Sequence, residues 1–259
     1  MTLNVNFYVA SGERHSDMPL VLLHGWAADA NCWQQLLPEL NKHRDIFTLD
    51  LPGFGNSPKL DSERLDDWLA ALLAVLPERA IYIGWSLGGM LATALAGQHP
   101  ERVAALATVA SNLKFVCGDG WRTAMPAKIE RGFYQGFCTA PEKTLRMFSA
   151  LIAQGDNDER AALKKIRSEQ SKGVNSGWNC ALQLLAAIDN RSVFSTLTIP
   201  GLHMLGEKDA LVPVSTAEAM QVLNPDQAIE IISDCGHAPH ITQVQKTLAL
   251  LQNFLVVQV

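Results

Sequence analysis

Gly84-Trp85-Ser86-Leu87-Gly88-Gly89 is the stretch that decides the fold of this 259-residue chain. It follows an apolar run, residues 80–83, and leads into a helix-prone run, residues 90–98. A strand, a sharp turn and a helix around the pattern G-x-S-x-G predict a nucleophile elbow, which holds the serine hydroxyl exposed at the end of a sheet. A Cβ at Gly84 or Gly88 would collide with the adjoining strand and helix, so both positions need glycine.

Short apolar runs alternate with amphipathic helical segments on either side of this turn. This alternation is typical of a mostly parallel, doubly wound sheet that is covered by helices on both faces, so the sequence predicts the α/β class. The expected strands are residues 4–9, 20–24, 46–50, 80–85, 103–110, 201–206 and 228–232. The expected helices between them are residues 31–43, 60–76, 87–99, 215–223 and 244–257.

The alternation breaks between about residues 111 and 190, where no strand is indicated. Four helix patterns occupy this stretch, at residues 127–137, 141–154, 157–170 and 177–188. A helical insertion between two sheet strands is typical of a lid. We therefore predict a core of residues 1–111 and 191–259 and a helical lid or cap of residues 112–190. Residues 121–190 hold ten Lys and Arg against seven Asp and Glu, so this part is basic on a chain of net charge −5.

Composition excludes several classes of protein. The net charge of −5 argues against a nucleic-acid partner. The five cysteines are scattered without a C-x-x-C pair, which argues against a disulfide framework and against a zinc site. The N-terminus carries no secretory signal pattern, and the longest apolar runs fall far short of the roughly 18 residues that span a bilayer. We expect a cytoplasmic protein without membrane contact and, because no heptad seam is visible, a monomer.

Two side chains later in the chain can act as the acid and the base that a serine nucleophile needs. A serine hydroxyl becomes a good nucleophile when a base accepts its proton and an acid orients that base, and the acid and the base each stand at the end of a later strand. Asp209 lies just past the strand expected at residues 201–206, and His237 lies past the strand expected at residues 228–232.

Other residues compete for both roles. Glu207 is the rival acid, and Asp209 is favoured because it lies just past the turn. Of the seven histidines, only His237 combines a strand end with the required chain order. His203 falls inside a strand and is expected to be a packed, hydrogen-bonded core residue, and His240 is expected to line a pocket.

An oxyanion hole completes such a site with two backbone N–H groups. One donor is expected from Leu87, the residue after the nucleophile, at the positive end of the following helix. The second is expected from the loop after an early strand, where Gly25 lets the backbone turn close to a substrate and Trp26 supplies the N–H.

These motifs together resemble the α/β-hydrolase superfamily. The resemblance rests on His24-Gly25, the Asp50-x-Pro-Gly-x-Gly loop, the stretch 84–89, His99-Pro-Glu-Arg, Asp209 and Gly236-His237. Within the superfamily, residues 22–26, 50–55, 84–89 and 108–111 are similar to the BioH-type carboxylesterases of biotin biosynthesis. Members of that group hydrolyse the methyl ester of pimeloyl-acyl carrier protein.

The resemblance implies an α/β-hydrolase fold and a role for each motif residue. It makes Ser86 the nucleophile, Asp209 the acid and His237 the base, with no metal and no organic cofactor. Trp26 and Leu87 become oxyanion and substrate-binding positions. Phe148 is similar to an aromatic residue of the family's pocket, although it reads equally as a lid phenylalanine that faces the core.

The substrates of that group are attached to acyl carrier protein, which is small and strongly acidic. The basic lid fits such a partner, and the best candidates for contact are Arg146, Lys164, Lys165 and Arg167. A solvated helix face without a specific role is the alternative for each. The same constellation also serves broad-specificity short-chain carboxylesterases, thioesterases and C–C bond hydrolases, and some proteins of this fold are receptors or scaffolds without activity.

Overall fold

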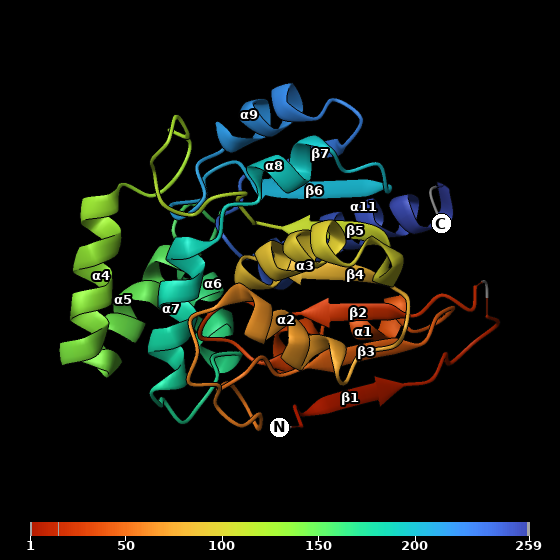
Figure 1. Cartoon of the computed structure of the whole chain (residues 1–259), viewed down its shortest axis with the longest axis horizontal. Coiled ribbons are helices and arrows are strands. Elements are labelled where there is room, and N and C mark those ends of the chain that lie inside the picture. Colours follow the sequence, from red (N-terminus) through yellow and green to blue (C-terminus); the bar gives the residue numbers. More distant parts are fainter. Residues whose placement is uncertain (1, 15, 258–259) are drawn as a thin grey trace.

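A computed structural model describes residues 2–14 and 16–257 of the chain. Seven strands form one sheet in the order β1-β3-β2-β4-β5-β6-β7 (Figure 1). Only β1 runs antiparallel to its neighbour, so the predicted α/β class with a mostly parallel sheet is confirmed. The strands are β1 (Val5–Tyr8), β2 (Leu20–Leu23), β3 (Ile46–Leu49), β4 (Ala80–Trp85), β5 (Val103–Val109), β6 (Gly201–Gly206) and β7 (Ala228–Ile232).

Helices cover both faces of the sheet. Alternate residues of β2 enter different cores, because successive side chains of a strand point to opposite faces. Val21 and Leu23 pack in the core on the side of α2, α3 and α8, whereas Leu20 and Leu22 pack in the core on the side of η1, α1 and α11. The helices outside the insertion are η1 (Ala30–Trp33), α1 (Leu37–Leu40), α2 (Leu65–Leu73), α3 (Leu87–Gln98), η2 (Pro100–Arg102), α8 (Arg191–Ser195), α9 (Thr216–Leu223), α10 (Pro239–Thr242) and α11 (Val244–Val257).

Four helices fill the chain between β5 and α8. They are α4 (Ala127–Thr139), α5 (Pro141–Ala153), α6 (Glu159–Ser168) and α7 (Gly177–Ala187), and they gather at one end of the sheet (Figure 1). We call them the lid helices. The division into a core of 1–111 and 191–259 and a lid of 112–190 stays a prediction, and residues 1, 15, 258 and 259 of that core lie outside the described residues.

The two ends of this insertion are fastened to each other. The Asn190 amide donates a hydrogen bond to the Leu113 carbonyl at 2.8 Å, and Lys114 forms an ion pair with Asp189 at 2.9 Å. Arg191 adds a two-pronged ion pair to the same carboxylate, a geometry stronger than a single contact. The insertion therefore leaves and re-enters the core at one place.

Two further hydrogen bonds tie residues 171–178 to loops of the core. The Ser171 amide donates to the Ala27 carbonyl at 3.0 Å, in the loop after β2. The Trp178 indole donates to the Gly53 carbonyl at 2.8 Å, in the loop after β3. The start of α7 is thus fixed to the loops that follow two neighbouring strands.

The expected helix over 31–43 is wrong. It is broken into η1 and α1, since Pro38 lacks the N–H that a continuous helix would need and instead stands in the first turn of α1. The helix expected over 60–76 is shorter at both ends. The Ser62 carbonyl accepts a hydrogen bond from the Trp68 indole, and its hydroxyl accepts one from the Arg64 amide, which holds the chain extended before α2.

Among the described residues, no helix is both long and apolar enough to cross a membrane. The sheet and its helices instead pack around two main apolar clusters, one on each face of the sheet.

Gly88 allows α3 to approach the sheet closely. A Cβ at this position would overlap the Leu23 and His24 carbonyl oxygens of β2 and its loop. A Cβ at Gly84 would lie 2.5 Å from the Gly88 and Gly89 backbone atoms. The collisions expected from the sequence are therefore present, and these glycines set the distance between β4 and α3.

Gly88→Ala should lower the free energy of unfolding, because the backbone atoms that the new methyl group meets cannot move aside. We expect a loss of about 1–3 kcal/mol, the usual cost of overpacking. Gly132→Ala is the matched control, since nothing lies within 4 Å of its Cβ position in α4. Alanine should stabilise that helix by about 0.5–1 kcal/mol. Urea unfolding of the two variants measures both changes, and equal effects would contradict the close approach of α3.

Candidate active site

Ser86 lies at the turn between β4 and α3 with its backbone in an unusual conformation. Its φ is 51° and its ψ is −114°, a region that L residues other than glycine rarely adopt. The Ser86 amide donates to the Val109 carbonyl at 2.9 Å, and the Ser111 hydroxyl donates to the Ser86 carbonyl at 2.9 Å. These bonds to the neighbouring strand and its loop hold the strained turn in place.

Ser86, His237 and Asp209 form one chain of hydrogen bonds. The Ser86 Oγ and His237 Nε2 are 3.0 Å apart, and the His237 Nδ1 and Asp209 Oδ2 are 2.7 Å apart. Because a carboxylate only accepts, His237 Nδ1 carries the proton and Nε2 is left to accept from the serine hydroxyl. The structure thus brings together three residues that are separated by up to 151 positions in the chain.

The Asp209 carboxylate is fixed from its other side. Its Oδ1 accepts hydrogen bonds from the Leu211 amide at 2.7 Å and from the Val212 amide at 3.0 Å. One oxygen is therefore engaged by the loop after β6, which leaves the other to orient the imidazole.

Glu207, the rival acid, points elsewhere. Its Oε2 accepts a hydrogen bond from the Asp234 amide at 3.0 Å, and its side chain is exposed. Among the described residues it makes no hydrogen bond with His237. The loop after β6 thus presents Asp209 and turns Glu207 to the surface.

Trp85 and Ile152 hold the backbone of His237 from two directions. The Trp85 indole donates to the His237 carbonyl at 2.8 Å, and the His237 amide donates to the Ile152 carbonyl at 3.1 Å. Ile152 lies near the end of α5, so one lid helix contacts the loop of the base directly. We infer that both bonds position the imidazole.

His240 was expected to line a pocket, but it is not among the residues that line the pocket at Ser86 and His237. Its ring lies between Trp33 and Trp85, with centroid distances of 4.6 Å to each. Burial, reinforced by the neighbouring His237, lowers the pKa of His240 to about 3, so the ring stays neutral. Neither of its ring nitrogens has a hydrogen-bond partner in the described part of the chain. His240 therefore acts as an aromatic spacer behind Trp85.

Two other buried histidines are structural. His203 shares hydrogen bonds with Thr108 at 2.8 Å and Gln227 at 3.4 Å, and burial lowers its pKa to about 4, so the prediction of a packed core histidine is confirmed. His24 Nδ1 donates to the Gly25 carbonyl at 2.7 Å, while its Nε2 accepts from the Leu51 amide at 2.8 Å. Burial lowers the pKa of His24. A neutral His24 thereby joins the loops after β2 and β3.

The backbone amides of Trp26 and Leu87 are available to a ligand. Neither donates a hydrogen bond to any acceptor among the described residues. Leu87 begins α3, so its N–H belongs to the positive end of that helix. At Gly25 a Cβ would lie 3.1 Å from the Trp85 ring and 3.3 Å from the Ser86 Cβ, which brings the loop after β2 against the nucleophile turn.

An apolar pocket opens onto Ser86 and His237. It encloses about 600 Å³ of space between atoms, open solvent at its mouth included. The loops after β2, β5 and β6 and the helices α4, α5 and α7 line it together. Its lining residues are Trp26, Ser86, Phe115, Met125, Ile129, Glu130, Phe133, Phe148, Leu151, Leu182, Leu185, Leu211 and His237.

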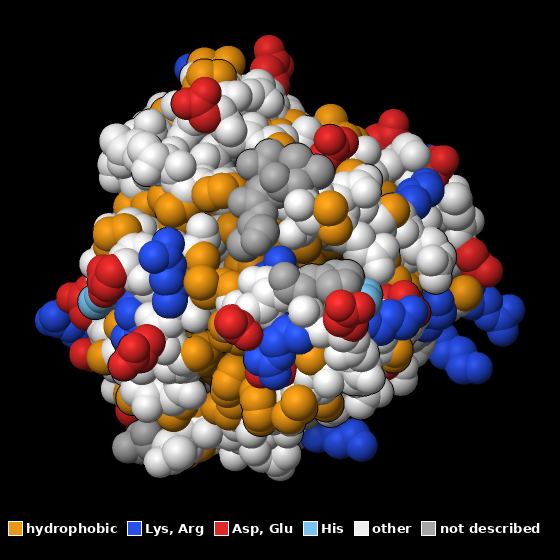
Figure 2. Space-filling model, turned by 90° about the vertical axis from the view of Figure 1, so that its right-hand side faces the viewer, with side chains coloured by type: hydrophobic (Ala, Val, Ile, Leu, Met, Phe, Trp, Pro, Cys, Tyr) orange, Lys and Arg blue, Asp and Glu red, His pale blue; other side chains and the backbone are white. Residues whose placement is uncertain are grey.

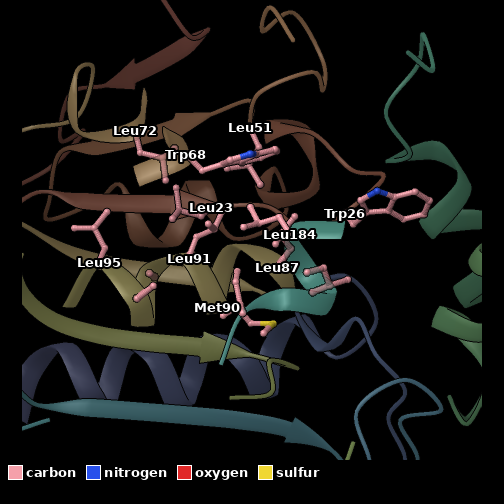
Figure 3. Packing of buried hydrophobic residues seen from close by; sticks show 14 of the residues in the cluster. Leu23, Trp26, Leu51, Trp68, Leu72, Leu87, Met90, Leu91, Leu95 and Leu184 are labelled. Atoms are coloured by element: carbon pink, nitrogen blue, oxygen red, sulfur yellow. The ribbon is translucent and has the colours of Figure 1, made fainter. Parts of the chain in front are cut away.

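Trp26 is the aromatic centre of this pocket. Its ring makes edge-to-face contacts at 4.9–5.7 Å with rings from three lid helices, those of Phe133, Phe137, Phe148 and Trp178. Figure 3 shows Trp26 at the lid end of the apolar cluster, away from Trp68 and Leu72 over the sheet. Phe148 lies in α5 and lines the pocket while it packs on Trp26.

The four predicted basic contacts are exposed on two lid helices. Arg146 lies on α5, 3.9 Å from Glu142, and Lys164, Lys165 and Arg167 lie on α6. No ion pair engages the three α6 cations within the described ranges. The structure places them on the outside of the lid, away from the Ser86–His237 hydrogen bond.

Most of the pocket wall was not predicted. A partial signal exists in α4, where Ile129, Phe133 and Phe137 recur at helical spacing and predict one apolar face. A similar signal exists in α7, where Trp178, Leu182 and Leu185 recur at helical spacing, whereas the side chains from the loops gave none. In the residues that the structure describes, no group of three or more His, Cys, Asp or Glu side chains is arranged to hold a metal ion.

Comparisons with known proteins agree on the fold, and the sequence comparison finds relatives that cover most of the chain. A family profile described as alpha/beta hydrolase fold matches residues 18–244. The biotin biosynthesis bifunctional protein BioHC of Cellvibrio japonicus is 43% identical over 91% of this chain and 47% of its own length, so the chain spans about half of that relative. The pimeloyl-acyl-carrier protein methyl ester esterase of Aeromonas hydrophila is 34% identical, over 95% of this chain and 98% of that protein. The structure of MenH from S. aureus superposes with a TM-score of 0.84 at 19% identity, covers 100% of this chain and 99% of its own, and shows the fold alone.

Asp209→Asn should slow covalent labelling of Ser86 by a serine-directed fluorophosphonate. The amide would donate to His237 Nδ1 and favour the tautomer that cannot accept the serine proton, so we expect a rate about 10³–10⁴-fold lower. Glu207→Gln is the matched control and should label at nearly the parent rate. Labelling rates followed by mass spectrometry decide between the two acids, and the reverse result would make Glu207 the acid.

Proposed function

The chain belongs to the alpha/beta hydrolase family, and from that premise we propose that it is a serine carboxylesterase that cleaves the methyl ester of pimeloyl-acyl carrier protein in biotin biosynthesis. The observation that carries the reaction class is the hydrogen-bonded chain Ser86–His237–Asp209 at the mouth of an apolar pocket. The Aeromonas hydrophila relative suggests the substrate, and the Cellvibrio japonicus relative suggests the pathway.

The first half of the reaction transfers the acyl group to the protein. Ser86 Oγ attacks the ester carbonyl carbon while His237 Nε2 accepts the hydroxyl proton. The C–O bond to the methoxy group then breaks, and His237 returns its proton to that oxygen, so methanol leaves. Asp209 holds the imidazole in orientation and stabilises its charged form.

The second half regenerates the serine. A water molecule gives a proton to His237 Nε2 and attacks the acyl carbon, after which the bond to Ser86 Oγ breaks and the proton returns to the serine. The product is the free acid. In both halves the oxygen of the carbonyl becomes negatively charged, and the unoccupied amides of Trp26 and Leu87 are the donors that stabilise it.

The pocket supports an acyl substrate. Its wall is formed almost entirely by aliphatic and aromatic side chains, which bind a methylene chain through apolar contact. Among the aromatic rings of that wall, those of Phe148 and Trp26 are closest, with centroids 4.9 Å apart. We assign both residues to substrate binding.

A broad-specificity short-chain carboxylesterase or thioesterase, or a C–C bond hydrolase, is the alternative. The apolar wall favours no particular acyl group, and the fold hosts all of these reactions. Turnover of pimeloyl carrier-protein methyl ester against a short p-nitrophenyl ester separates the two readings, because only the favoured one predicts a preference for the carrier-bound ester.

Acyl carrier protein is the proposed partner, and the basic side chains of α5 and α6 are its proposed contact. Arg146, Lys164, Lys165 and Arg167 are exposed on the lid and suit an acidic surface. Figure 2 shows the face at the opposite end of the sheet, where acidic and basic side chains are interspersed. The cytoplasmic location and the monomeric state stay predictions.

Ser86→Ala should fold as the parent does and lose ester hydrolysis by about 10⁴-fold or more, because the nucleophile is gone while the packing of the turn remains. The most informative readout is growth of a biotin auxotroph that lacks this esterase step. The parent chain should restore growth without biotin, and the variant should not. Growth supported by the variant would remove the proposed mechanism, and no growth with an active parent would favour the alternative substrates.

Charge reversal on α6, in the triple variant Lys164→Glu/Lys165→Glu/Arg167→Glu, should raise KM for the carrier-bound ester by roughly ten-fold. Hydrolysis of p-nitrophenyl butyrate should stay at the parent rate, since these side chains lie outside the pocket. The effect on KM should shrink at high salt.

A matched control places the same charge change at the other end of the sheet. Arg14, Lys42 and Arg79 precede β2, β3 and β4, and their replacement by Glu should leave KM unchanged. Equal KM increases in the two triple variants would mean that net charge, and not the lid, governs the encounter.

A further inference from the structure

Glu130 is the one carboxylic acid in the wall of the pocket. It lies on α4, directly after Ile129 and one helical turn before Phe133, and both of these residues also line the pocket. Apart from Ser86 and His237, every other lining residue is aliphatic, aromatic or Met. An acidic side chain therefore stands in an otherwise apolar wall, at a position that stays partly exposed to solvent.

The carboxylate of Glu130 has no partner. Within residues 2–14 and 16–257 it forms no ion pair and accepts no hydrogen bond, and its side chain is only partly exposed. Burial raises its pKa, and the nearby Arg131 offsets part of that rise. Glu130 lies in the first turn of α4, where the helix dipole favours a negative charge, so the carboxylate is kept ionised beside the apolar wall.

We propose that Glu130 is a specificity-determining residue that excludes free carboxylates from the acyl pocket, an inference that rests on the proposed function. A neutral methyl ester carries no charge into the pocket and meets no repulsion. The free acid that hydrolysis produces is an anion, and a second negative charge beside Glu130 in an apolar pocket is disfavoured.

This repulsion acts on the product and not on the substrate. The reaction converts a neutral group into a carboxylate in the same pocket, so a fixed negative charge there weakens product binding after each turnover. The consequence is weak product inhibition and a pocket that rejects monocarboxylates of similar chain length.

The test compares an anionic ligand with a neutral ligand of the same chain length. Heptanoate and heptanamide have the same length, and their dissociation constants can be measured by calorimetry with the full chain near neutral pH. Glu130→Gln should tighten heptanoate binding by about ten-fold and change heptanamide binding little, because it removes a charge without removing volume. The ratio of the two constants is the readout, and it does not depend on turnover.

Glu142→Gln is the matched control. Glu142 lies on the neighbouring lid helix with its side chain 86% exposed and outside the pocket. It should leave the ratio at the parent value. An unchanged ratio in Glu130→Gln, or an equal change in Glu142→Gln, would overturn the inference. Hydrolysis of p-nitrophenyl butyrate by the parent is measured separately and tests the proposed function alone.

Discussion

The close approach of α3 to the sheet is the constraint on which the rest of the structure depends. Gly84 and Gly88 remove the side chains that would keep the helix away, and the turn between them forces Ser86 to a φ of 51°. Such a conformation costs about 1–3 kcal/mol. The burial of α3 offsets it, because every residue from Leu87 to Ala96 is buried. The distance between α3 and the sheet thus determines the positions of the serine hydroxyl and of the first amide of α3. It also determines the position of the loop after β2, which contacts both.

Much of the sheet could be predicted from the sequence, and the reason is local. Strands β4, β6 and β7 have the predicted bounds, since each is a short apolar run between turn residues. Because those strands run parallel, Asp209 and His237 could be assigned to one edge of the sheet from chain order alone. Where the prediction was wrong, at residues 31–43, the apolar periodicity continued through Pro38 and concealed a break in the helix.

The rest of the site depends on contacts between segments that are distant in the chain, and such contacts produce no periodic pattern in the sequence. The Trp85 indole and the His237 carbonyl are 152 positions apart, and no pattern links them. His240 was expected to face the pocket because it follows His237 closely, yet the short helix α10 turns it toward Trp33 instead. Glu130 was not singled out from the sequence, and its place in the pocket wall follows only from how α4 lies against α5 and α7.

The lid helices are attached to the core unequally. The end of α5 is bonded to the His237 loop, and the start of α7 is bonded to the loop after β3. For α4, by contrast, no hydrogen bond or ion pair to the sheet or its loops is found in the described part of the chain, and it packs on α5, α7 and the Trp26 ring. Mutations in α4 can therefore accumulate with little effect on the alignment of Ser86 and His237. During divergence of such proteins, this helix is where a new substrate preference can arise while the chemistry is preserved.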